Sequence, residues 1–196
     1  MKAPALAVAV ALTVLAGSTR AYQASPTGQP VDEPFAKAGT IRMSLAAGDY
    51  RISGRVDERI RVAWRADKAE DAANLKAQAE IRGTSAVLST SGFRNGVHFT
   101  IEVPSRSDIE IDLTAGDLDV RGIEGSKRID TWAGDVSIDI GQPEQYRVVE
   151  ASVRAGDLTA APFKVSKGGL FRSFSWTGKG PYSLKVKLFA GDLTLR

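Results

Sequence analysis

The 196-residue sequence has no cysteine and only one histidine, His98. Without cysteine the chain has no disulfide bond and no thiolate metal site. The lone histidine lies between Val97 and Phe99 on an expected strand, and nothing in the sequence places a nucleophile or a second base beside it. A Ser-His-Asp type of hydrolase is therefore not indicated.

Long hydrophobic runs are also scarce. The one clear run, residues 5–16, follows Lys2, is too short to span a bilayer comfortably, and precedes small residues that allow cleavage after Ala21 or after Ser18. The sequence predicts a secretory signal over residues 1–21 and an exported protein, periplasmic or at the cell surface. No transmembrane helix is expected once this signal is removed.

The chain also lacks a large excess of either positive or negative charge. The chain has 26 Lys+Arg and 23 Asp+Glu, and loss of Lys2 and Arg20 with the leader leaves 24 against 23, a net charge of about +1. No basic field covers the whole protein, so nucleic acid is not an expected partner. Residues 22–38 are rich in proline and form an expected linker, followed by a single domain over residues 39–196.

A short word, Ala-Gly-Asp, occurs five times in this domain. Before each glycine, apolar residues alternate with polar ones, and after it the phase of the alternation is reversed, with Lys127 as the one clear exception. A bend at Gly-Asp allows both halves of the apolar set to face one core, and glycine supplies the unusual φ that such a corner needs. The predicted corner residues are Gly48, Asp49, Gly116, Asp117, Gly134, Asp135, Gly156, Asp157, Gly191 and Asp192.

Stacking of such arches predicts an all-β fold, a short right-handed β-solenoid capped by N-terminal strands. The spacing predicts that the corners at Gly116, Gly134 and Gly156 are consecutive rungs. Residues 66–80, alanine-rich and free of β-branched side chains, predict one short helical insertion. Asn95-Gly96 predicts a hairpin between strands near residues 86–90 and 97–103.

The chain resembles a large bacterial domain-of-unknown-function family whose members are called "putative adhesins". The resemblance covers roughly residues 35–196 and implies an extracytoplasmic, β-helix-like domain of the bacterial envelope, with no catalytic residues to carry over. The segments that carry it are FTIEVPSRSDIEIDLTAGDLDVRGIEG at 99–125, RIDTWAGDVSIDI at 128–140 and GKGPYSLKVKLFAGDLTL at 178–195.

The five corner aspartates have two interpretations. As a ladder of carboxylates about 4.8 Å apart they would repel one another unless a cation such as Ca²⁺ bound between them. As turn residues they would accept backbone N–H bonds, as aspartate beside glycine often does. The flanking residues offer no further side-chain oxygens, so we favour structural corners and expect neither a metal nor a cofactor.

Three residues next to the corners define the expected binding face. Trp132 and Phe189 occupy the same outward position, two before the glycine, and Arg154 is expected to neighbour Trp132. We therefore expect a non-catalytic envelope or surface protein, an adhesin-like binding or scaffolding module for a protein or an envelope polysaccharide. The alternatives are a carbohydrate-active β-helix enzyme that uses acids such as Asp112 and Asp130, and an accessory partner of an envelope sensor. End-to-end self-association stays open.

Overall fold

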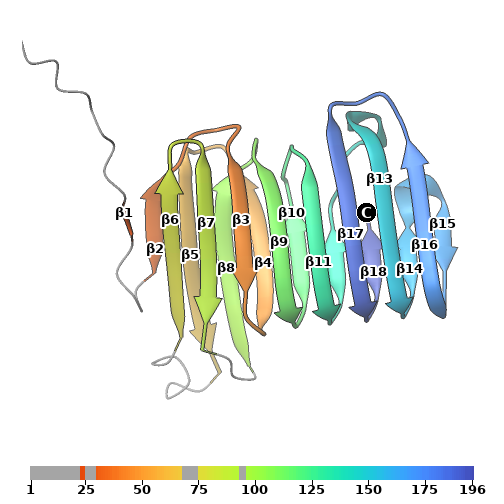
Figure 1. Cartoon of the computed structure of the whole chain (residues 1–196), viewed down its shortest axis with the longest axis horizontal. Coiled ribbons are helices and arrows are strands. Elements are labelled where there is room, and N and C mark those ends of the chain that lie inside the picture. The colour runs from red at the N-terminus through yellow and green to blue at the C-terminus, as the bar shows by residue number, and fades with distance from the viewer. Residues whose placement is uncertain (1–22, 25–29, 68–74, 93–95) are drawn as a thin grey trace, which may run out of the picture.

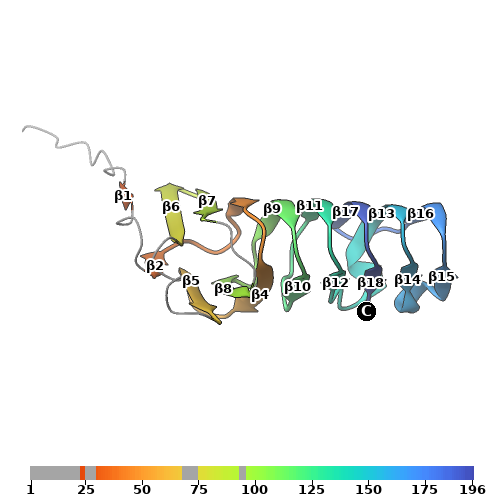
Figure 2. The same ribbon diagram turned by 90° about the horizontal axis from the view of Figure 1, so that it is seen from below.

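The computed structural model describes residues 23–24, 30–67, 75–92 and 96–196. These residues form two mixed, open β-sheets of nine strands each, which lie face to face as two layers (Figures 1 and 2). Sheet A runs in the order β1 (Gln23–Ala24), β6 (Lys76–Arg82), β7 (Ser85–Ser91), β3 (Thr40–Leu45), β9 (Asp108–Ala115), β11 (Lys127–Ala133), β17 (Tyr182–Ala190), β13 (Tyr146–Ala155) and β16 (Leu170–Thr177). Sheet B runs in the order β15 (Val165–Lys167), β14 (Leu158–Ala160), β18 (Leu193–Leu195), β12 (Val136–Ile138), β10 (Leu118–Arg121), β4 (Asp49–Arg55), β8 (Val97–Pro104), β5 (Arg59–Ala66) and β2 (Val31–Pro34). The helical elements in the described residues are two 3₁₀ turns, η1 (Pro143–Gln145) and η2 (Ala161–Phe163).

Each Ala-Gly-Asp word joins a strand of sheet A to a strand of sheet B. The five pairs are β3 with β4, β9 with β10, β11 with β12, β17 with β18, and β13 with β14. Within both sheets the strands of neighbouring pairs are parallel and in register, so that Asp130 lies beside Asp112 and Leu118 lies beside Val136. Equivalent positions of the five words therefore form rows that run across the strands.

The core fills the space between the two layers. The positions three, five and seven residues before each corner glycine, and two and four after it, are all buried. The alternation expected from the sequence is thus confirmed, and each large aliphatic residue in these rows contributes about 1.5–3 kcal/mol on burial. Two polar residues, Thr131 and Lys127, occupy the same inward rows and are buried with the rest.

The predicted right-handed β-solenoid is wrong. The sheets are open and mixed, with antiparallel pairs such as β5 with β8 and β13 with β16 towards their ends. The neighbours are also not in sequence order, because β17 lies between β11 and β13. The corners at Gly134 and Gly156 are therefore separated by the corner at Gly191. The sequence pattern encodes the bend and the buried face of each unit, which are the same for every unit, and carries no information about which unit lies next to which.

Two local predictions are also wrong. Lys76–Glu80, within the predicted helical insertion, belongs to strand β6, where Ala77 and Ala79 face the core; residues 68–74 lie outside the described part of the chain. The strands on either side of Asn95-Gly96 do not form a hairpin, since β7 pairs in sheet A and β8 in sheet B. The predicted signal over residues 1–21 and part of the predicted linker likewise lie outside the described residues.

Candidate functional site

The corner glycines bring the backbones of neighbouring units into contact. Gly134 has a φ of +119°, and a Cβ atom at this position would lie 2.2 Å from the carbonyl oxygen of Gly116. Gly116, Gly156 and Gly191 have similar geometry, each facing the carbonyl oxygen of a neighbouring corner glycine at 1.9–2.2 Å from the ideal Cβ position. Gly48, in the first unit, differs because its nearest contact is a Phe99 ring atom at 3.4 Å. Four of the five corners therefore exclude any side chain on both conformational and steric grounds.

The corner aspartates form a hydrogen-bonded ladder. The carboxylate of each of the first four accepts the backbone N–H of the aspartate in the next unit across the sheet. The bonds run from Asp117 N–H to Asp49 (3.4 Å), from Asp135 N–H to Asp117 (3.1 Å), from Asp192 N–H to Asp135 (2.9 Å) and from Asp157 N–H to Asp192 (2.9 Å). One backbone donor thus lies between each pair of carboxylates and offsets their repulsion.

A metal site was the alternative for this ladder. In the described part of the chain, no three or more His, Asp or Glu side chains are grouped so that they could hold a metal ion. The absence of calcium binding stays a prediction, which is tested below.

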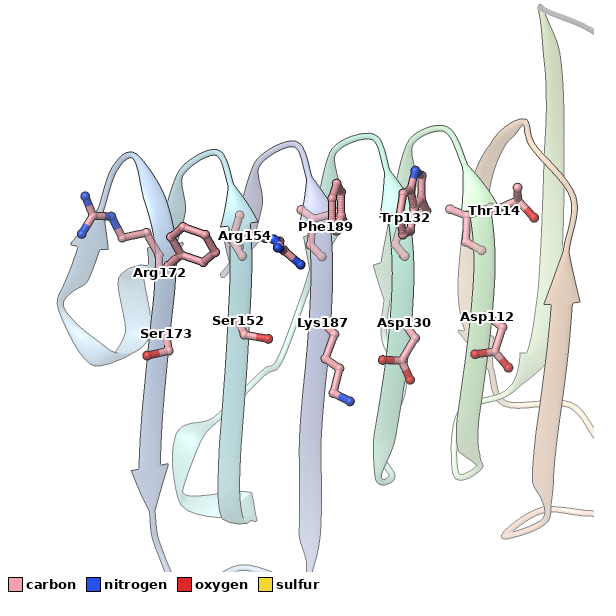
Figure 3. Close-up of a pocket in the computed structure, with 15 residues that line it drawn as sticks. Asp112, Thr114, Asp130, Trp132, Ser152, Arg154, Arg172, Ser173, Lys187 and Phe189 are labelled. Atoms are coloured by element: carbon pink, nitrogen blue, oxygen red, sulfur yellow. The ribbon is translucent and has the colours of Figure 1, made fainter.

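A groove of about 650 Å³ crosses the outer face of sheet A (Figure 3). It extends over five neighbouring strands, β9, β11, β17, β13 and β16. Two rows of outward side chains line it: a polar row of Asp112, Asp130, Lys187, Ser152 and Ser173, and a second row, nearer the corners, of Thr114, Trp132, Phe189, Arg154 and Phe171. The rows follow from the register of the strands, so in-register pairing turns single outward residues into a continuous surface.

The second row contains a stack of rings and one cation. The rings of Trp132 and Phe189 lie parallel, with centroids 4.1 Å apart and 5° between the planes. The Arg154 guanidinium lies over Phe189 at 5.1 Å and over Phe171 at 5.5 Å. The three residues predicted as a binding face, Trp132, Phe189 and Arg154, are thus brought together. The expected direct contact between Trp132 and Arg154 is wrong, because β17 places Phe189 between them.

One face of the Trp132 ring is open. Phe189 covers the face directed towards β17, while the opposite face is directed towards β9, where the equivalent residue is the small Thr114. Thr114 donates its hydroxyl to the Leu45 carbonyl at 3.3 Å, on the side away from Trp132. The Trp132 side is left open and the residue is 63% exposed. No N-terminal strand covers it in the described part of the chain.

A second, more polar groove of about 360 Å³ lies on the outer face of sheet B. At its centre Asp119 accepts hydrogen bonds from Arg121 Nε at 2.8 Å and Arg196 Nη2 at 2.7 Å. Partial burial raises the pKa of Asp119, but the hydrogen bond from Arg121 and the nearby guanidinium charges outweigh it, so the net pKa lies below its ordinary value. This groove is internally neutralised, which makes it a less favourable site for a charged ligand.

His98 lies at the edge of this second groove. Its Nδ1 is 3.2 Å from an Asp49 carboxylate oxygen, and its Nε2 is 3.6 Å from an Asp67 carboxylate oxygen. The side chain is partly exposed, and no serine or threonine among the described residues of the surrounding groove forms a hydrogen bond with it. The arrangement places one imidazole beside two carboxylates at the first corner and does not resemble a nucleophile with its base.

Lys127, the exception in the sequence pattern, is buried in the core. Its Nζ donates to the Gly125 carbonyl at 3.0 Å and to the Tyr146 hydroxyl at 2.8 Å. Burial lowers the pKa of Lys127 to about 8, although the charges of Asp139, Asp108 and Glu124 oppose the shift. Burial also raises the pKa of Tyr146. This pair faces away from both grooves, and we assign it to the stability of the fold.

The binding face predicted from the sequence did not include two residues of the sheet A groove, Phe171 and Lys187. Phe171 has a φ of +54°, which is rare for a bulky residue and invisible in a sequence pattern. Lys187 enters the groove only because β17 lies between β11 and β13. The sequence does show that Lys187 lies four residues before its corner glycine, at the same outward position as Asp112 and Asp130 in their units.

No protein-family model matches the chain, and no curated protein matches it in sequence. Among solved structures, the chain is similar to a "putative cell adhesion protein" from Clostridium sporogenes, with a TM-score of 0.54 and 16% sequence identity. The alignment covers 85% of this chain and 99% of that one. No helix in the described residues has the length and apolar character needed to cross a membrane. The structural likeness extends over nearly the whole of the neighbour, and at this level of identity it shows a shared fold.

Proposed function

We propose that the protein is an exported, non-catalytic binding module of the bacterial cell envelope, and that it binds a polysaccharide in the sheet A groove. The name of the structural neighbour supports a role in adhesion. The sequence supports export through its expected leader over residues 1–21. The aromatic and charged side chains of the groove provide the contacts with the polysaccharide.

The open face of Trp132 is the observation that carries this proposal. A pyranose ring presents a patch of C–H groups that packs well on an aromatic face, and tryptophan offers the largest such face. Phe189 fixes the plane of the indole by stacking on its other side at 4.1 Å. The platform is therefore rigid before a ligand arrives, which reduces the entropy cost of binding.

The polar row completes a site suited to sugars. Asp112 and Asp130 lie side by side on β9 and β11. Each lies two residues before the second-row residue of its own strand, which is Thr114 on β9 and Trp132 on β11. Carboxylates beside an aromatic face accept hydrogen bonds from sugar hydroxyls, which fixes the orientation of a ring that stacking alone leaves free. The groove is shallow and open, as an extended polymer requires.

Binding of immobilised polysaccharides to the wild type and to Trp132→Ala tests the proposal. We expect at least a tenfold loss of affinity in Trp132→Ala, with little change in melting temperature because the side chain is exposed. Val56→Ala is the matched control, since Val56 is an apolar residue that is 86% exposed and does not line the groove. Equal binding by the wild type and Trp132→Ala across neutral and acidic polysaccharides would contradict the proposal.

A carbohydrate-active enzyme is the second candidate, favoured by the adjacent carboxylates of Asp112 and Asp130 in the same groove. Asp130 also forms an ion pair with Arg128 at 2.9 Å, so its carboxylate already has a partner within the protein. We expect no new reducing ends when the protein is incubated with a polysaccharide that it binds. Cleavage that is lost in Asp112→Asn and Asp130→Asn would establish the enzyme instead.

Export is tested separately by N-terminal sequencing of protein recovered from the envelope. We expect mature chains that begin at Tyr22 or Thr19, after the two small-residue sites. An intact Met1 on that material would contradict cleavage of the leader.

A further inference from the structure

Charge is unevenly distributed along the sheet A groove. The carboxylates of Asp112 and Asp130 lie on β9 and β11, at one end, while Lys187 and Arg154 lie on β17 and β13, towards the other. Asp130 is paired with Arg128. Among the described residues, neither Lys187 nor Arg154 has a carboxylate within ion-pair distance, whereas the nearby Lys185 pairs with Glu150 at 3.0 Å. At the cationic end of the groove, Lys187 and Arg154 therefore have no ion-pair partner among the described residues.

Arg154 is held in a fixed position. Its guanidinium lies between the rings of Phe189 and Phe171, at 5.1 and 5.5 Å from their centroids. Stacking on both faces leaves the in-plane N–H groups as the free donors, and these match the two oxygens of a carboxylate. The side chain is exposed, so a ligand can reach those donors without displacing either ring.

The backbone at Phe171 supports a role for this arrangement. A φ of +54° is unfavourable for an aromatic residue, and strained conformations of this kind are retained where the surrounding structure requires them, frequently at ligand sites. Here the result is a 71% exposed ring beside the Arg154 guanidinium. A strained residue that exposes an apolar ring has no evident benefit for folding, since it buries little surface.

We propose that the polysaccharide bound in this groove is acidic, and that one of its carboxylate groups binds between Arg154 and Lys187 while a neutral sugar of the same chain stacks on Trp132. This inference rests on the proposed function of the same groove. Trp132 and Arg154 lie on strands β11 and β13, with β17 between them, which places them about 10 Å apart across the sheet. The open face of Trp132 is directed towards β9, so a sugar stacked on it lies about one strand spacing further from Arg154. The matching ligand alternates neutral and acidic sugars, because Asp112 and Asp130 disfavour a second carboxylate at the Trp132 end.

A calorimetric titration of the full mature chain tests this inference with three oligosaccharide probes. A hyaluronan octasaccharide alternates uronate and neutral residues, its carboxyl-reduced form has the same backbone without charge, and a chitin hexasaccharide is neutral throughout. We expect the acidic octasaccharide to bind at least tenfold more tightly than its reduced form at low salt, and this advantage to shrink in 0.5 M NaCl because the contact is exposed.

Variants separate the anion site from the aromatic platform. Arg154→Gln is expected to remove most of the preference for the acidic octasaccharide over its reduced form. Lys185→Gln is the matched control and is expected to keep the preference. Lys185 is an outward lysine on the same strand as Lys187, but the charge of Lys185 is already paired with Glu150.

The outcomes distinguish the two proposals. Equal affinity for the acidic and reduced octasaccharides, with binding still dependent on Trp132, overturns the acidic ligand and leaves the polysaccharide-binding function standing. A preference for the acidic form that survives Arg154→Gln overturns the assigned anion site. Binding to none of the three probes, together with no Trp132-dependent binding to any immobilised polysaccharide, overturns both.

Discussion

The backbone N–H of Asp135 donates a hydrogen bond to the Asp117 carboxylate at 3.1 Å, across two neighbouring corners of the fold. The same donor and acceptor positions recur in the other units, so the aspartate of one corner satisfies a backbone group of the next. This relationship accounts for aspartate after glycine without invoking a ligand.

Substitution of Asp117 tests the ladder directly. Asp117→Ala removes the acceptor of the Asp135 N–H and is expected to lower the free energy of unfolding by about 1 kcal/mol. Asp117→Asn is expected to cost less, since its amide oxygen still accepts the bond. Asp157→Ala is the control, because no N–H in the described residues donates to the Asp157 carboxylate, and it should be nearly neutral. Denaturant titrations compare the three, and equal losses in all of them would contradict the ladder.

Calcium is expected to have no clear effect on stability. Each corner offers one carboxylate, which in four of the five corners already accepts a backbone hydrogen bond, and this is far short of the six to eight oxygens that Ca²⁺ takes. Genuine binding at about 100 times Kd would add roughly 2.7 kcal/mol, an easily measured rise in melting temperature. A rise in millimolar Ca²⁺ that is lost in the double variant Asp117→Asn, Asp135→Asn would make the ladder a metal site.

The corner glycines are expected to be more sensitive than the aspartates. Gly134→Ala places a Cβ 2.2 Å from the Gly116 carbonyl oxygen at a φ of +119°, and we expect a loss of roughly 2–4 kcal/mol. Gly134→Val should cost at least as much. Gly48→Ala is the matched control, because its Cβ would meet nothing closer than 3.4 Å. Thermal melts in which Gly134→Ala is no less stable than Gly48→Ala would contradict the close approach of the corners.

Lys127 predicts an unusual dependence of stability on pH. Its folded pKa of about 8 lies below its ordinary value of 10.5, so between these values the unfolded chain binds more protons than the folded one. The free energy of unfolding therefore rises with pH across this window, by an amount on the order of 2 kcal/mol. Above pH 10 the sign reverses, because burial raises the pKa of Tyr50 to about 12 and also that of Tyr146, and the folded state then keeps protons that the unfolded state loses.

Lys127→Met is expected to abolish the rise between pH 8 and 10 and to leave the fall above pH 10 in place. Lys185→Met, a substitution of an exposed lysine, serves as the control and should retain the rise. Urea unfolding at closely spaced pH values gives the profile. A rise of the same size in Lys127→Met would place its origin in another group.

The sequence predicted the local features of the fold because they depend on a few adjacent residues. Leu113 and Leu118 lie on opposite sides of a Gly-Asp pair, and the reversed phase between them required a bend. The order of the units could not be predicted in this way. It depends on contacts between segments far apart in the chain, such as Trp132 with Phe189, and each unit carries nearly the same inward pattern.

The candidate site was predictable to the same extent. The outward positions of Trp132, Phe189 and Arg154 follow from their distance to the glycine, and they do share one face. The spatial order of these three residues along that face depends on which unit lies next to which, so the predicted contact between Trp132 and Arg154 was wrong. The helical prediction for residues 76–80 was wrong for a related reason. Ala77 and Ala79 are buried residues of strand β6 that face the core, and alanine content alone does not distinguish this role from a helix.

The position of β17 between β11 and β13 has a consequence for assembly. β13 and β16 precede β17 in the chain, yet β13 pairs with β17 and makes no pairing with β11. As the chain emerges, the segment over residues 146–177 has no docking surface on the growing stack until residues 182–195 have followed it. Folding is therefore expected to wait for long-range contacts and to be slow, with the edges of β11 and β13 exposed in the meantime. A chain that stays unfolded until its last strands have followed is in the state that translocation through a membrane channel requires, so this topology is compatible with the proposed export.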